Sequence, residues 1–86
     1  MLFEELNKAV LYLNETLPHK TKTIIMQSEY NNLISYHFSI GIFIRTNLLD
    51  NTTLYHLLKS KGMKNKDDMS ILILQLFYLY INNKTP

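Results

Sequence analysis

The chain has no cysteine and no tryptophan, and only two glycines, two prolines and one arginine. The lack of cysteine excludes a disulfide framework, a thiolate metal site and a cysteine nucleophile. With few prolines and an apolar content of 47%, the sequence is unlike that of a disordered chain. Its length of 86 residues predicts a single helical domain, residues 1–86. The formal net charge of +2 is too small to indicate nucleic-acid binding by itself.

Long hydrophobic runs are also missing. The most apolar stretch, Met69–Ile81, is shorter than the about 20 residues that span a bilayer, and Gln75 interrupts it. The start of the chain carries Glu4 and Glu5 where a secretion signal needs basic residues. We therefore predict a cytoplasmic protein without membrane contact. The many lysine, asparagine and isoleucine residues have A/T-rich codons, which indicates a bacterial or phage source.

The spacing of apolar residues predicts helices in the first third of the chain. A helix over residues 2–16 ends before Pro18, because a residue that precedes proline avoids helical geometry. Residues 19–26 fit either a short helix or a loop with apolar side chains packed inward. The residues on one face of the first helix are Phe3, Leu6, Val10, Leu13 and Leu17.

The rest of the chain predicts three further helices. Ser28 is the expected N-cap of a helix that runs to about residue 47, although alternating isoleucines at positions 40–44 leave a strand as the alternative. A shorter helix has Asp50 or Asn51 as its expected N-cap and ends at Gly62. The last helix covers residues 66–82, with Asn65 as its N-cap. The predicted fold class is all-α, a small bundle of four to five helices.

Two segments resemble a known family. The sequence HFSIGIFIRTNL at residues 37–48 resembles the pattern HFGLGxWIRNNF in a family of small bacterial or phage domains of unknown function. The sequence KDDMS at residues 66–70 resembles the PDDMS that opens the last helix in that family. The positions that match are His37, Gly41, Arg45, Asp67, Asp68 and Met69.

The chain departs from the family pattern at four positions. Ser39 replaces a glycine, Phe43 a tryptophan, Thr46 an asparagine and Lys66 a proline. A proline at that last position suits the first residue of a helix, which agrees with Asn65 as the cap. The resemblance implies a helical fold and carries no activity.

His37, Gly41 and Arg45 are four residues apart and share one face of a helix. One interpretation is a small anion pocket. We favour a structural role, in which Gly41 permits close helix packing and Arg45 forms an ion pair with Asp67 or Asp68. If that pair is buried, removing Arg45 is expected to cost about 3 kcal/mol. The two aspartates otherwise act as cap and dipole partners in the first turn of the last helix.

No residues have the spacing of a catalytic or ligand-binding motif. The three histidines lack metal-ligand spacing, and no glycine-rich loop is present to bind phosphate. We therefore predict no enzyme, no metal and no cofactor.

The last helix suggests a binding surface. It is apolar on all sides, so it is either central in the bundle or partly covered by a partner. We predict a protein that binds another protein, as a regulator or inhibitor of the immunity or phage anti-defence kind. The alternatives are a nucleic-acid-binding protein that uses the basic loop Lys59–Lys66, and a structural homodimer. The expected partner-binding residues are Phe77, Tyr78, Tyr80, Lys64 and Lys66.

Overall fold

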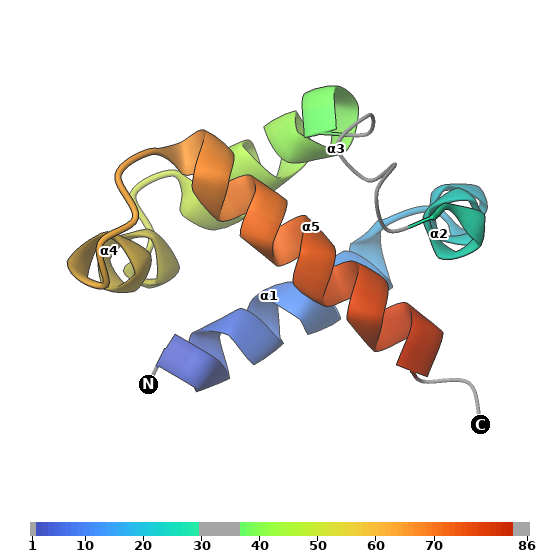
Figure 1. Cartoon of the computed structure of the whole chain (residues 1–86), viewed down its shortest axis with the longest axis horizontal. Helices are drawn as coiled ribbons and strands as arrows, with labels where there is room; N and C mark the ends of the chain where they lie inside the picture. The colour runs from blue at the N-terminus through green and yellow to red at the C-terminus, as the bar shows by residue number, and fades with distance from the viewer. Residues whose placement is uncertain (1, 30–36, 84–86) are drawn as a thin grey trace.

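The computed structural model describes residues 2–29 and 37–83, and all its regular elements in these ranges are helices (Figure 1). This confirms the predicted all-α class, and residues 19–26 belong to a helix rather than a loop. The elements are α1 (Leu2–Thr16), α2 (His19–Gln27), α3 (His37–Ile44), the π-helix η2 (Arg45–Leu49), α4 (Thr53–Ser60) and α5 (Lys66–Asn83).

Helix α5 is the central element. Figure 1 shows it crossing the middle of the molecule, with α1 on one side and α3 and α4 on the other. It contacts every other helical element of the described residues. Because its neighbours surround it, α5 can carry apolar side chains over most of its circumference. This agrees with its sequence, which is apolar on all sides. Its buried side chains are Met69, Ser70, Ile73, Leu74, Phe77 and Ile81.

The core is one cluster to which every helical element contributes. Helix α1 supplies Ala9, Val10 and Leu13, whereas Phe3 lies on the surface. The prediction that Phe3 belongs to the inward face is therefore wrong. At 100° per residue, Phe3 lies about 80° around the helix axis from Leu13, at the edge of the face that meets the core.

The ends of α4 and α5 show how local sequence sets helix limits. Asn65 caps α5, because its Oδ1 accepts a hydrogen bond from the Asp68 backbone N–H at 2.8 Å. Gly62 follows α4 with a φ of 103°, and the Met63 N–H donates to the Leu58 carbonyl at 3.2 Å, which is a Schellman motif.

The predicted cap of α4 is corrected by the structure. Thr52, rather than Asp50 or Asn51, accepts the capping hydrogen bond, from the Tyr55 N–H at 3.2 Å. Asn51 instead has a φ of 60°, which turns the chain between η2 and α4. A residue in this left-handed conformation cannot act as an N-cap, because that position needs an extended backbone.

The helix predicted to end at about residue 47 continues to Leu49, because the π-helix η2 follows α3 directly. Its wider turn holds one residue more than an α-turn. Asn47 compensates for part of the altered backbone bonding, since its Nδ2 donates to the Phe43 carbonyl at 2.9 Å. Residues 40–44 are helical, which excludes the strand alternative. The predicted start of this helix after Ser28 falls partly on residues 30–36, outside the described residues.

Candidate functional site

The two flanks of α1 each border a hollow in the surface. On one flank, α1 and α5 enclose a groove of about 240 Å³, which we call the apolar groove. None of its lining residues is charged, and two of its side chains are prominent: Phe3 is 81% exposed and Leu79 is 45% exposed. The groove is lined by Phe3, Leu6, Asn7, Val10, Leu76, Leu79 and Tyr80.

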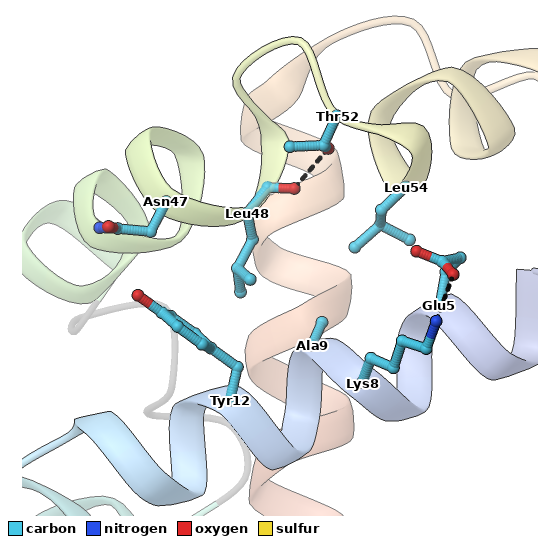
Figure 2. A pocket seen from close by; sticks show the side chains of 8 residues that line it. All are labelled: Glu5, Lys8, Ala9, Tyr12, Asn47, Leu48, Thr52 and Leu54. Atoms are coloured by element: carbon cyan, nitrogen blue, oxygen red, sulfur yellow. Dashed lines mark hydrogen bonds and ion pairs between the residues drawn. The ribbon is translucent and has the colours of Figure 1, made fainter.

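The opposite flank of α1 borders a second hollow of about 280 Å³, which we call the α1–α4 cleft (Figure 2). Helix α1 forms one wall, with Tyr12 at one end, Ala9 in the middle, and Glu5 and Lys8 at the other end. Leu48 faces this wall from η2, and Leu54 of α4 lies above the end that holds Glu5 and Lys8. Asn47 and Thr52 complete the lining of the α1–α4 cleft.

Polar groups of the cleft already make contacts within the chain. Lys8 Nζ lies 3.3 Å from Glu5 Oε2. The Thr52 hydroxyl donates to the Leu48 carbonyl at 2.6 Å, a bond drawn in Figure 2. The Tyr12 ring stacks on Phe43 of α3, with ring centroids 6.3 Å apart. These contacts hold the walls of the cleft in place.

Arg45 and Asp67 form an ion pair between η2 and α5, with 2.5 Å between Nη1 and Oδ1. The other candidate, Asp68, instead accepts a hydrogen bond from Asn65 Nδ2 at 3.3 Å, which orients the capping side chain of Asn65. The pair is not buried: the Arg45 side chain is 28% exposed and that of Asp67 is 65% exposed. Gly41 is buried in α3, which packs against α5, and the side chain of His37 lies outside the described residues.

The structure divides the predicted partner-binding residues. Phe77 is fully buried in the core, so its assignment to a partner surface is wrong. Tyr78 is half-buried, and its hydroxyl donates to the Ser28 carbonyl at 2.9 Å, where it fastens α5 to the end of α2. Tyr80 is half-buried and lines the apolar groove.

The two predicted lysines lie at the opposite end of α5 from these aromatic residues. Lys64 is exposed before α5, and Lys66 is in the first turn of α5. Fourteen residues separate Lys66 from Tyr80, which corresponds to roughly 21 Å along a helix. A partner surface that contains both these lysines and the aromatic residues would therefore extend along most of α5, and it stays a prediction.

Lysines instead gather around Tyr55 on α4. The Nζ atoms of Lys59 and Lys66 lie 5.6 Å and 5.4 Å from the centre of its ring, within the range of cation–π attraction. Lys66 also pairs with Asp50, with 3.2 Å between Nζ and Oδ1. Part of the positive charge at this end of the molecule is thus balanced by a nearby carboxylate.

Tyr80 is a predicted partner-binding residue that lines the apolar groove, whereas no residue of the α1–α4 cleft is predicted from the sequence as a binding residue. The sequence marks Glu5 only as an acidic residue near the start of the chain, and it predicts no role for Lys8, Ala9 or Tyr12. One signal was available, because Ala9 is the only alanine in the chain and a small buried side chain leaves space beside it. Across residues 2–29 and 37–83, no group of three or more metal-ligating side chains comes together. None of the helices described is long and apolar enough to cross a membrane.

The fold defines a small all-α domain assembled around one central helix. The chain belongs to the family described as a domain of unknown function (DUF6794), whose model matches residues 4–81. This agrees with the resemblance to an uncharacterised family. No curated protein and no solved structure matches the chain.

Proposed function

We propose that this protein acts in the cytoplasm, without catalysis, by binding another protein as a regulator or inhibitor. The observation that carries the proposal is the apolar groove. Phe3 and Leu79 flank a hollow without a charged lining residue, and a contiguous apolar surface of this kind is typical of a protein-binding site. Aromatic residues such as Phe3 and Tyr80 are enriched at such interfaces. The proposal moves the binding surface from Phe77 and Tyr78 to the groove beside them.

We expect the wild-type chain, carrying an affinity tag, to retain one protein partner from a bacterial extract at high salt. The composition supports a bacterial or phage source, so the extract comes from a bacterium with an A/T-rich genome. The variant Phe3→Asp/Leu79→Asp places two charges in the groove and should lose the partner. The readout is the stoichiometric protein in the eluate, identified by mass spectrometry.

Ile42→Asp is the matched control. Ile42 is 46% exposed on α3, close to the 45% of Leu79, but it does not line the groove. It should therefore retain the partner, and far-UV circular dichroism should show that all variants are helical. Equal recovery by the groove variant and by wild type would contradict the proposal. Recovery of the chain's own copies alone, with a doubled mass in sedimentation, would favour the homodimer.

A second candidate function is nucleic-acid binding through the basic loop Lys59–Lys66. It is supported by Tyr55, whose ring lies beneath two lysine side chains and offers a surface for base stacking. Affinity would then fall steeply as salt rises, because bound phosphates release counterions. The pairing of Lys66 with Asp50 weakens this candidate, since it reduces the local positive charge.

A further inference from the structure

We propose that the α1–α4 cleft is a second binding site, which accepts one arginine side chain from a partner chain and pairs it with Glu5. The site lies on the opposite flank of α1 from the apolar groove and shares none of its lining residues. It therefore goes beyond the protein-binding role proposed for the groove.

The size of the cleft limits its occupant. Its volume of about 280 Å³ lies just below the range of roughly 300–1,000 Å³ that small-molecule sites occupy. The space exists because Ala9 brings only a methyl group to the wall of α1, between the longer side chains of Glu5 and Tyr12 (Figure 2). A hollow of this size, open to solvent, suits a single side chain that enters from outside.

The charges of the cleft favour a cation. Among its lining residues, Glu5 is the one carboxylate and Lys8 the one ammonium group. The side chain of Glu5 is 27% exposed, whereas that of Lys8 is 73% exposed. Water therefore screens the charge of Lys8 more than that of Glu5, so the carboxylate has the larger effect on the electrostatic potential inside the cleft. Because an exposed pair three residues apart is weak, an incoming cation can replace Lys8 at little cost.

Among cationic side chains, the cleft fits arginine best. A guanidinium binds a carboxylate through two parallel hydrogen bonds and is less strongly hydrated than an ammonium group. Its methylene groups can lie against Ala9 and Leu54, beside the end of the cleft that Glu5 occupies (Figure 2). Lysine lacks the two-pronged geometry, and an anion would face Glu5.

The backbone of the opposite wall is irregular in a way often found at binding sites. Asn47 and Leu48 of the lining belong to the π-helix η2, and π-turns occur frequently at functional sites. The left-handed Asn51 directly precedes Thr52, another lining residue. This irregularity is a second observation that agrees with the charge and the shape of the cleft.

The test is a titration of the full ¹⁵N-labelled chain with N-acetyl-arginine amide, followed by amide chemical shifts. N-acetyl-citrulline amide is the control ligand, because citrulline has nearly the same shape without the charge. We expect saturable shifts around Ala9 and Leu54, with affinity about tenfold weaker for the citrulline compound, as the loss of a charged hydrogen bond predicts.

Three variants locate the site. Glu5→Gln should abolish the preference for arginine over citrulline, and Ala9→Leu should abolish binding by filling the hollow. Lys8→Gln should strengthen arginine binding about two- to threefold, because it removes the competing cation. Glu15→Gln, an exposed carboxylate of α1 that does not line the cleft, should leave binding unchanged.

Equal binding of the two ligands, an unchanged preference in Glu5→Gln, or weaker binding in Lys8→Gln would each overturn the proposal. Absence of saturable shifts in the wild type would also overturn it. The remaining amide shifts of each variant report whether the fold is intact. Because the probe is a free amino-acid derivative, failure here leaves the protein-binding proposal for the apolar groove standing, and that proposal has its own variants.

Discussion

Arg45 shows how solvent exposure determines the contribution of one ion pair to stability. The sequence indicates a pair with Asp67 or Asp68, and the structure has the pair with Asp67. Removing Arg45 would cost about 3 kcal/mol of stability if the pair were buried, because the carboxylate of the aspartate would then have neither a partner nor solvent. The side chain of Asp67 is mostly exposed, so water solvates its carboxylate when the arginine is removed. The smaller value typical of surface pairs therefore applies.

We predict a coupling free energy of about 0.5–1 kcal/mol between Arg45 and Asp67 in a double-mutant cycle. The cycle combines Arg45→Ala with Asp67→Ala and measures the free energy of unfolding in urea. The parallel cycle with Asp68→Ala should give a coupling near zero, because Asp68 contacts Asn65 instead. A coupling larger with Asp68 than with Asp67 would show that the pairing is wrong.

Helix α5 begins at a cap that the sequence itself specifies. The Asn65 side chain caps the helix by accepting a hydrogen bond from the Asp68 N–H. Its Nδ2 also donates to the Asp68 carboxylate, which orients the capping amide. Lys66 follows as the first helical residue. This local arrangement depends on four consecutive residues, which is why it could be predicted without the fold.

Asn65→Ala should lower the free energy of unfolding by about 1 kcal/mol, because it leaves an N–H group of the first turn without its acceptor. Asn65→Gly should cost only a few tenths of a kcal/mol, since glycine is tolerated at this position. Urea denaturation followed by circular dichroism measures both values. Lys64→Ala, one residue earlier and exposed, is the control and should change stability by less than about 0.5 kcal/mol. A larger loss for the glycine than for the alanine variant would contradict the role of the cap.

The whole molecule is held by a single cluster of buried side chains. Every helical element contributes to it, and α5 contacts all the others. The radius of gyration of 12.3 Å is close to the about 12 Å expected of a folded chain of this length. No helix in the described ranges has a core of its own, and losing α5 would remove contacts from all the rest.

We therefore expect the chain to unfold in one cooperative step. Far-UV circular dichroism reports the helices, and tyrosine fluorescence reports packing, because the chain lacks tryptophan. The two urea denaturation curves should coincide. A fluorescence transition at lower urea concentration than the loss of helix would show that part of the molecule unfolds independently.

Features that depend only on neighbouring residues can be predicted from the sequence. The limits of α1 follow from Pro18 and from its apolar spacing, and the ends of α4 and α5 follow from Gly62 and Asn65. Each of these signals acts over a few residues through backbone geometry or one hydrogen bond. They suffice to predict an all-α chain, both limits of α1, the end of α4 and the start of α5.

Which apolar residues are buried, and where the hollows lie, depends instead on how the helices pack together. Phe3 and Phe77 look alike in an apolar pattern, yet one lies on the surface and the other in the core. In the same way, nothing in the sequence of α3 or η2 indicates the wider π-turn. Burial depends on which helices cover a face, and that is fixed by contacts between residues far apart in the chain. The apolar groove and the α1–α4 cleft arise at such contacts, because each lies between α1 and a helix from the second half of the chain.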